Sequence, residues 1–456
     1  MANREKLFGT DGIRGIANRY PMTSEIALQV GRATALFFKG QGKRVDGNSV
    51  ILIGKDTRRS SYMIEQALAA GIMSAGARAL FLGPMPTPGV AFLTQSMRAD
   101  AGIMVSASHN TYEYNGIKIF GADGFKLPDE VEAEIERMVL SEDLMNVLPI
   151  GEALGRAKRI DDALGRYVVH AKSSFPNNID LSGMRIVLDC AHGAAYKVAP
   201  LVFEELGAEL VLLGNSPDGI NINRECGALH PQSMCEAVNK YRADLGIALD
   251  GDADRVILAD DKGEVVDGDQ IMAILAIALK KKGKLNRNTL VATQMSNMGL
   301  EIALKTAGIQ IEYTPVGDRA VVEALRKGSY SLGGEQSGHL VFMEAGSTGD
   351  GIVAGLAVLA VMREEKEKLS DLRKVMTIMP QVLKNLKVAR KPDLETLPEV
   401  KKTMDALRDK LGNSGRLLVR YSGTEPLCRV MIEGQDRDEI SKMADELIAV
   451  ISKNIS

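Results

Sequence analysis

The chain has 456 residues, of which 45% are hydrophobic and 25% are charged, so neither a disordered nor a fibrous protein is expected. Its 56 basic and 59 acidic side chains give a net charge of −3. That balance lacks the basic excess of a nucleic-acid-binding protein, and the absence of tryptophan argues against base stacking. At about 150 residues per domain, the length predicts roughly three domains, with two or four as alternatives.

The cysteines and the apolar segments indicate where the protein works. None of the four cysteines forms a C-x-x-C pair, which fits a reducing cytoplasm better than a disulfide framework. The charged N-terminus lacks the apolar core of a signal peptide. The most apolar runs, such as residues 351–362, are too short to span a membrane. We therefore expect a cytoplasmic protein that has neither a membrane nor a nucleic acid as its partner.

Short β-rich runs, each followed by a Gly-rich or polar loop and then a helical pattern, recur along the chain. In order, the predicted strands are residues 49–54, 101–105, 185–189, 243–249 and 289–293. Ser60 or Ser61 is predicted to cap a helix that runs to Ala70. Strands that alternate with helices predict α/β layers with largely parallel sheets, whose ligands gather at loops beyond the carboxyl ends of the strands.

Boundaries between domains are predicted near residues 151–161, 260–268 and 363–371. The last of these contains the charge run 363–368, which indicates a solvated helix face or a linker. Beyond it the pattern changes to α+β, with a helix around residues 397–411, strands near 416–421 and 428–433, and a final helix.

The sharpest local signal is the acidic segment Asp250-Gly251-Asp252-Ala253-Asp254-Arg255, which follows a predicted buried strand. Three carboxylates this close repel one another, and a hard divalent cation such as Mg²⁺ would relieve the repulsion. A surface acidic turn is the structural alternative, and an EF-hand loop is a poor one because Arg255 stands where glycine is needed. An aspartyl-nucleophile phosphatase, with Asp252 as the nucleophile, is the strongest competing interpretation.

A second polar cluster, Ser106-Ala107-Ser108-His109-Asn110, follows the second predicted strand. Ser108 is a candidate nucleophile or phosphate carrier, and His109 beside it is a candidate acid or base. A polar turn at the end of a strand is the structural alternative.

The segment 115–120 returns toward this cluster as a further strand. Ile117 and Ile119 are expected to face the core, while Lys118 points the other way, toward the loops. There it could stabilise phosphate charge or move a proton. An ordinary exposed lysine is the alternative.

Three Gly-rich segments carry further candidate ligands. Residues 420–426, with Arg429 beyond them, combine arginine, two hydroxyls and a glycine N–H that suit a phosphate. No Walker A motif occurs, so a P-loop NTPase is excluded. The turn 8–15 presents Arg14 to a phosphate or phosphoserine. The loop 333–339 suits the hydroxyls of a polyol through Glu335, Ser337 and His339, although a structural role for the histidine is equally open.

Together and in this order, the clusters resemble the α-D-phosphohexomutase family of phosphoglucomutases, phosphomannomutases and phosphoglucosamine mutases. The resemblance covers nearly the whole chain, and residues 8–15, 292–299, 334–339 and 348–351 are most similar to the bacterial-type phosphoglucosamine mutases. It implies an α/β fold of four domains around a central cleft: three related α/β domains with mixed or parallel sheets and a smaller α+β C-terminal domain. Their implied spans are residues 1–155, 156–258, 259–368 and 369–456.

The resemblance also assigns roles, motif by motif. Ser108 would hold the phosphate and would supply a metal ligand beside Asp250, Asp252 and Asp254. The residues around the reacting phosphate would be Arg14, His109, Asn110 and Lys118. Lys118 is the usual candidate for the general acid/base, with His109 as the other. Sugar binding would fall to Glu335, Ser337 and His339, and the distal phosphate to Arg420, Ser422, Gly423, Thr424 and Arg429.

The implied activity is the interconversion of glucosamine 6-phosphate and glucosamine 1-phosphate, which feeds amino-sugar nucleotide and cell-wall precursor synthesis. It implies one Mg²⁺ per chain and a hexosamine 1,6-bisphosphate as activator. The partner would be a small sugar phosphate, and because members of this type are often dimers, the resemblance points to a homodimer. The alternatives are a glucose or mannose phosphate mutase, the phosphatase above, and a sugar-phosphate-binding protein with a structural cation.

Overall fold

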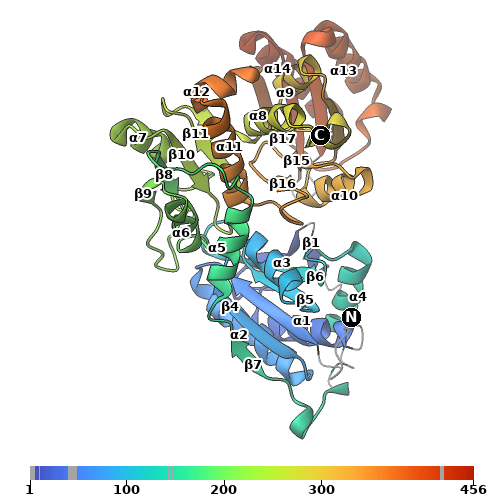
Figure 1. Cartoon of the computed structure of the whole chain (residues 1–456). Helices are drawn as coiled ribbons and strands as arrows, with labels where there is room; N and C mark the ends of the chain where they lie inside the picture. Colours follow the sequence, from blue (N-terminus) through green and yellow to red (C-terminus); the bar gives the residue numbers. More distant parts are fainter. Residues whose placement is uncertain are drawn as a thin grey trace. The chain divides into compact units, whose positions relative to one another are not determined.

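The computed structural model describes residues 6–9, 11–39, 49–141, 144, 147–421 and 426–455. Over those residues the strands form a seven-stranded, a five-stranded, a four-stranded and a three-stranded sheet (Figure 1). The chain divides into two compact units, Met1–Gln294 with Ile309–Lys374, and Met295–Gly308 with Val375–Ser456. The first unit holds the three larger sheets and the second holds the smallest. Mixed α/β sheets followed by a small α+β part are the predicted fold class.

The first sheet has parallel strands at its centre and antiparallel strands at one edge. In spatial order its strands are β1 (Phe8–Gly9), β2 (Gly12–Ile16), β6 (Tyr114–Gly121), β5 (Ala101–Val105), β3 (Val50–Lys55), β4 (Arg78–Pro84) and β7 (Ala157–Arg159). Strands β3, β4, β5 and β7 are parallel, whereas β6 runs antiparallel to both β5 and β2. The helices are α1 (Ser24–Phe38), α2 (Arg59–Ser74), α3 (Thr87–Ser96) and α4 (Asp129–Leu140).

Side-chain alternation along β3 decides which helices cover each face of this sheet. Ile51 and Ile53 belong to the buried cluster that also contains residues of α1 and α2. Gly54 faces the opposite side, where an added Cβ would lie 2.3 Å from Cγ2 of Val90 on α3. Helices therefore cover both faces, which is why the strand is buried at every position.

The cap predicted for the following helix is wrong. Helix α2 begins at Arg59, with Arg58 as its N-cap residue, and it continues to Ser74, so that Ser60 and Ser61 lie inside it. The backbone N–H of Arg59 donates instead to the carbonyl oxygen of Gly219 at 2.9 Å, and the hydroxyl of Ser61 donates to Oδ1 of Asp56 at 2.8 Å. The hydroxyl of Ser61 is thus used in a contact with Asp56, and the start of α2 has no side-chain cap.

Two further α/β layers complete the first unit. The second sheet has the order β12 (Val265–Val266), β11 (Val256–Ala259), β10 (Leu245–Leu249), β8 (Arg185–Asp189) and β9 (Glu209–Leu213), with helices α5 (Ala163–Ser173), α6 (Val198–Glu205) and α7 (Gln232–Tyr241). The third has the order β14 (Gln310–Thr314), β13 (Thr289–Thr293), β15 (Leu332–Gly334) and β16 (Leu340–Phe342), with helices α8 (Gly268–Lys281), α10 (Asp318–Gly328), α11 (Gly351–Glu365) and α12 (Leu369–Leu372). Both combine parallel strands with an antiparallel edge.

The second unit is a three-stranded antiparallel sheet covered by helices. Its strands are β17 (Gln381–Lys387), β19 (Leu427–Glu433) and β18 (Arg416–Tyr421), and its helices are α9 (Met298–Thr306), α13 (Pro398–Leu411) and α14 (Arg437–Ile455). Val430, Ile432, Leu447 and Ile451 are fully buried in its core. The predicted helix and strands of this part are confirmed to within one residue.

The apolar run 351–362 and the first part of the charge run form helix α11, which ends at Glu365. Helix α11 is buried over most of its length, and residues 364–368 at its end are exposed, as the charge run predicts. Across the described part of the chain, no helix combines the length and the apolar character that crossing a membrane requires.

We predict that the close contact between α1 and α2 requires glycine. A Cβ at Gly71 would lie 2.0 Å from the carbonyl oxygen of Leu28, so Gly71→Ala should destabilise the protein by about 1–3 kcal/mol. Gly165 on α5 is the matched control, because its Cβ would meet nothing within 4 Å and Gly165→Ala should be neutral or stabilise by up to about 1 kcal/mol. Denaturant midpoints measure both, and equal midpoints for the two variants would contradict the packing argument.

Candidate active site

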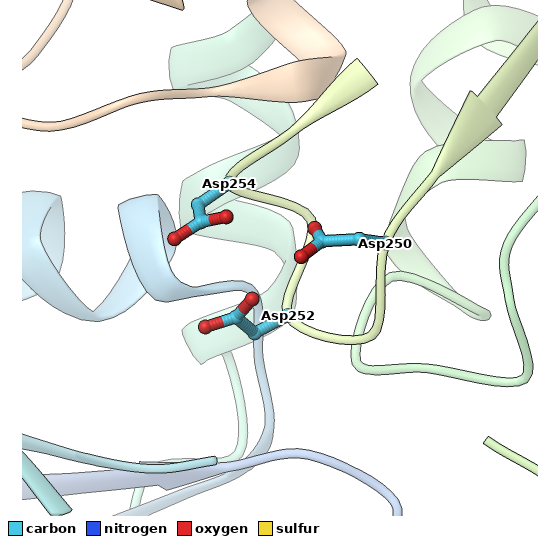
Figure 2. A group of neighbouring side chains, drawn as sticks. All are labelled: Asp250, Asp252 and Asp254. Atoms are coloured by element: carbon cyan, nitrogen blue, oxygen red, sulfur yellow. The ribbon is translucent and has the colours of Figure 1, made fainter. Parts of the chain in front are cut away.

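The acidic segment forms the loop between the antiparallel strands β10 and β11. Figure 2 shows the carboxyl groups of Asp250, Asp252 and Asp254 on the same side of this loop. One oxygen from each carboxylate lies within 4.8 Å of the others, and all three residues are buried. The loop is therefore an interior acidic cluster, which excludes the surface acidic turn. The flanking strands also exclude an EF-hand, which requires helices.

Burial raises the electrostatic cost of holding three carboxylates close together and shifts the pKa values of Asp250 and Asp254. Burial, together with the charges of Asp254 and Asp252, raises the pKa of Asp250 well above its ordinary value. Burial also acts to raise the pKa of Asp254, but Lys118, His339 and Arg255 together outweigh it and hold that pKa well below its usual range. The positive charge next to the three carboxylates is therefore too small to neutralise all of them.

The cluster fits a divalent cation. Oδ1 of Asp252 and Oδ1 of Asp254 are buried and have no hydrogen-bond partner among the described residues. Buried acceptors without a donor are costly, and a cation coordinated by both oxygens would remove that cost. Carboxylate oxygens are the donors that hard cations such as Mg²⁺ prefer. The residues present therefore match a magnesium site.

Ser108 lies directly against the acidic cluster. It stands in the loop after β5, and its hydroxyl donates to Oδ2 of Asp250 at 2.6 Å. Nδ1 of His109 is 3.3 Å from the same hydroxyl oxygen. Ser108 has a left-handed backbone with φ of 50°, which is uncommon for a residue with a Cβ and turns the side chain toward the acidic loop.

Lys118 approaches the cluster from the neighbouring strand. Alternation on β6 places Ile117 and Ile119 in the hydrophobic core and Lys118 on the opposite face, as predicted. Its Nζ is 3.1 Å from Oδ2 of Asp252 and 3.4 Å from Oδ2 of Asp254. Because only 2% of its surface is exposed, the alternative of an ordinary exposed lysine is wrong.

The charge state of Lys118 follows from its neighbours. Burial alone would lower the pKa of Lys118, but the carboxylates of Asp11, Asp252 and Asp254 hold it well above its ordinary value. The side chain is therefore an ammonium, and it carries positive charge into the acidic cluster.

His109, Asn110 and Arg14 border the same site. Burial, with the nearby charges of Arg255 and Arg14, lowers the pKa of His109 to about 4. Its imidazole is thus neutral at physiological pH and can accept a proton. Arg14 donates to Oδ1 of Asn110 at 3.2 Å and to Oδ2 of Asp11 at 2.6 Å, which brings the turn between β1 and β2 to the serine loop.

The predicted sugar-binding residues lie on the turn between β15 and β16. Oε1 of Glu335 accepts from the backbone N–H of Gly317 at 3.1 Å, and Ser337 is exposed. His339 is buried, and its Nε2 accepts from the backbone N–H of Gly349 at 3.1 Å. A cavity of about 700 Å³ joins this turn to the acidic loop, and its lining includes Asp11, Arg14, Asp254, Arg255, Glu335 and His339.

The predicted phosphate loop belongs to the second unit. Arg420 on β18 and Arg429 on β19 are directly paired across the two antiparallel strands. Burial and the charge of Arg429 lower the pKa of Arg420, as expected when like charges face each other. A bound anion would relieve this repulsion. The other predicted members, Ser422, Gly423 and Thr424, lie outside the described residues.

A chain of ion pairs that sequence reasoning missed supports Lys118. Oδ2 of Asp11 is 3.3 Å from Nζ of Lys118, and Asp11 also pairs with Lys126. Lys126 pairs in turn with Asp318, the first residue of α10. Asp11 lies in the Gly-rich turn 8–15 together with Arg14, and its negative charge was a signal from which a place in the site could have been predicted. Lys126 and Asp318 are 192 residues apart, and no local pattern connects them.

Comparison with known families matches all four parts of the chain. Residues 5–145, 165–263 and 267–379 match the α/β/α domains I, II and III of phosphoglucomutase/phosphomannomutase, and residues 383–450 match its C-terminal domain. The chain therefore belongs to the phosphoglucomutase/phosphomannomutase family, the α-D-phosphohexomutases, which are isomerases.

Full-length relatives narrow the assignment within this family. The chain is 57% identical over 452 residues to a phosphoglucosamine mutase of Syntrophotalea carbinolica, with 99% of this chain and 98% of the relative covered. It is 51% identical over 457 residues to a phosphoglucosamine mutase of Bdellovibrio bacteriovorus, with both chains covered completely. The chain is thus of the bacterial phosphoglucosamine mutase type, as the motifs predict.

Solved structures share the fold at low sequence identity. A phosphoglucomutase/phosphomannomutase family protein from Burkholderia thailandensis has a TM-score of 0.78 at 23% identity, covering 98% of this chain and 97% of the other. The N-acetylphosphoglucosamine mutase of Aspergillus fumigatus, in complex with GlcNAc-6P and magnesium, has a TM-score of 0.71 at 18% identity, covering 99% and 96%. These similarities support the four-domain α/β fold.

We predict that His109 stays neutral across the working pH range. Because its pKa is lowered to about 4, the imidazole should gain a proton only as the pH falls through about 4, well below the value near 6.5 of an unperturbed histidine. NMR titration of its ring proton, assigned by loss of the signal in His109→Asn, measures this. A midpoint near 6.5 would contradict the burial argument.

Proposed function

We propose that the chain interconverts glucosamine 6-phosphate and glucosamine 1-phosphate through a phosphoserine at Ser108 and a glucosamine 1,6-bisphosphate. The observation that carries this proposal is the 2.6 Å contact between the hydroxyl of Ser108 and Oδ2 of Asp250. It puts a phosphate carrier beside a cluster that fits a divalent cation, and phosphoryl transfer needs both in one place. The product would feed amino-sugar nucleotide and cell-wall precursor synthesis.

In the first half-reaction, the bond between phosphorus and Oγ of Ser108 breaks and a bond to O1 of the sugar 6-phosphate forms. The proton of the sugar hydroxyl must leave, and Oγ of Ser108 must gain one. The two candidates for moving these protons are His109, whose Nδ1 lies 3.3 Å from Oγ, and Lys118, whose Nζ lies 3.1 Å from Oδ2 of Asp252. The bisphosphate then turns round, and its other phosphoryl group returns to Ser108.

One Mg²⁺ per chain would be held by Asp250, Asp252, Asp254 and an oxygen on Ser108. When bound, it supplies positive charge that offsets the negative charge of the transferring phosphoryl group. The Aspergillus fumigatus relative was solved with magnesium, and the unpartnered buried oxygens of this chain favour the same ion. Lys118 and Arg14 would bind the remaining phosphoryl oxygens.

The binding sites for the sugar and for the second phosphate are assigned to two further loops. Glu335, Ser337 and His339 would bind sugar hydroxyls, because two of them line the cavity of about 700 Å³ and the third is at the tip of the same turn. The phosphate that is not reacting would be held by Arg420, Ser422, Gly423, Thr424 and Arg429. The facing charges of the two arginines support this assignment.

The activator, the oligomeric state and the domain spans are proposals as well. Hexosamine 1,6-bisphosphate would act as activator by phosphorylating Ser108, and the Aspergillus fumigatus relative was solved with glucose 1,6-bisphosphate as an S69A variant. We propose a homodimer, and four domains with the spans 1–155, 156–258, 259–368 and 369–456. Glucose and mannose phosphates are the competing substrates within the family.

The phosphate carrier is testable by intact-mass measurement after incubation with glucosamine 1,6-bisphosphate. The wild-type protein should gain one phosphate, and Ser108→Ala should gain none and lose turnover. A phosphate adduct that persists in Ser108→Ala would rule out Ser108 as the carrier.

A panel of glucosamine, glucose and mannose phosphates with Mg²⁺ should give the highest kcat/KM for glucosamine phosphate, and a preference for either neutral sugar would overturn the substrate assignment.

The metal site is testable with Asp252→Asn. Removing one buried carboxylate should weaken Mg²⁺ binding at least about tenfold and lower kcat by about 100-fold or more, because both the ligand and the charge balance around Lys118 change. Asp161→Asn, at an exposed carboxylate, is the matched control and should leave both quantities unchanged. Isothermal titration with Mg²⁺ measures the affinity, and an unaltered affinity in Asp252→Asn would exclude it as a ligand.

A further inference from the structure

Arg58 is a fully buried arginine directly beneath the serine loop, residues 106–110. It stands between β3 and α2, and none of its surface is exposed. Its Nη2 donates to the carbonyl oxygen of Ser108 at 3.1 Å and to that of Asn110 at 2.5 Å, and its Nη1 donates to the hydroxyl of Ser106 at 3.3 Å. One guanidinium therefore contacts the loop at three residues.

Asn223 reaches the same two carbonyl groups from the second sheet's side of the site. It lies in the segment between β9 and α7, and its Nδ2 is 2.9 Å from both the carbonyl oxygen of Ser108 and that of Asn110. Each carbonyl thus accepts from two side chains that are 165 positions apart in the sequence. Gly251 of the acidic loop completes the contact, because a Cβ there would lie 2.5 Å from the carbonyl oxygen of Ser108.

The charge of Arg58 is already neutralised. Its Nη1 forms an ion pair with Oδ2 of Asp56, which is equally buried. Oδ1 of Asp56 accepts from the backbone N–H of Arg58 at 2.9 Å, so the aspartate also fixes the arginine's own position. A neutralised guanidinium that donates to carbonyl groups orients a loop, whereas an arginine that binds phosphate would present its charge to the ligand.

The serine loop needs these contacts because the backbone angles of Ser108 are energetically unfavourable. Ser108 has a φ of 50°, and its N–H donates to the hydroxyl of Ser106 at 2.9 Å within a tight turn. Residues with a Cβ avoid this region unless the surroundings fix them in it. Release of the carbonyl groups would let Ser108 relax toward ordinary backbone angles and would carry Oγ away from Asp250.

We propose that Arg58 and Asn223 are positioning residues, which clamp the carbonyl groups of Ser108 and Asn110 so that Oγ of Ser108 is held against the acidic cluster. This inference rests on the proposed function, since it concerns the same phosphate carrier. The clamp joins the first and second sheets at the reacting atom. It predicts that loss of either residue slows phosphoryl transfer without weakening the binding of the sugar phosphate.

The test is Asn223→Ala, with Asn221→Ala as the matched control. Asn221 lies in the same segment and also makes two hydrogen bonds, to Ser216 and Asp218, but it does not touch the serine loop. We expect kcat of Asn223→Ala, normalised to the fraction of protein that carries phosphate on Ser108, to fall by about 10- to 100-fold. KM for the sugar phosphate should stay within about threefold, and Asn221→Ala should keep its normalised kcat.

A second variant, Arg58→Lys, keeps the charge opposite Asp56 but loses the planar fork that reaches both carbonyl groups. It should show the same fall in normalised kcat, and if it does not fold, Asn223→Ala decides alone. A normal kcat per phosphorylated Asn223→Ala molecule, or an equal loss in Asn221→Ala, would overturn the inference. All variants are compared on whichever hexose phosphate the wild type isomerises, so a wild type inactive on glucosamine phosphate refutes the proposed function and still tests the clamp.

Discussion

Three carboxylates buried within 4.8 Å of one another are the constraint on which the rest of the active site depends. Such a cluster is costly unless positive charge compensates it, and the chain supplies only part of that charge, through Lys118 and the neighbouring Arg255. The remaining deficit is what makes a divalent cation a fitting ligand. The loop between β10 and β11 is thus held in a state that favours a bound cation.

The constraint also explains why the first two sheets meet where they do. Lys118 comes from β6 of the first sheet and the aspartates from the second, so the ion pairs between them fix one layer against the other. Ser108 adds its hydroxyl bond to Asp250 across the same junction. Phosphoryl transfer demands positioning above all, and the groups proposed to be catalytic are positioned by the contacts that neutralise the buried charge.

The third sheet is tied to this junction by a chain of charged groups. Asp11 links Lys118 to Lys126, and Lys126 pairs with Asp318 at the start of α10. The neighbouring Gly317 donates to Glu335, the residue assigned to the sugar hydroxyls. Lys118 and Glu335 are therefore connected through fixed contacts within the first unit, and a change at one of them is expected to reach the other.

The sequence by itself determined most of the elements and the central chemistry, because those signals are local. The strands at 101–105, 185–189 and 289–293 followed from apolar runs, the cation site from three aspartates at alternate positions, and the inward direction of Lys118 from its place between Ile117 and Ile119. Tertiary structure alone decided the supporting groups. These are the pairing of Lys126 with Asp318, the convergence of Arg58 and Asn223 on the serine loop, and the contact of the first N–H of α2 with the carbonyl oxygen of Gly219. A local pattern records which residue types stand next to each other along the chain, whereas these contacts arise from how the separate layers pack in space.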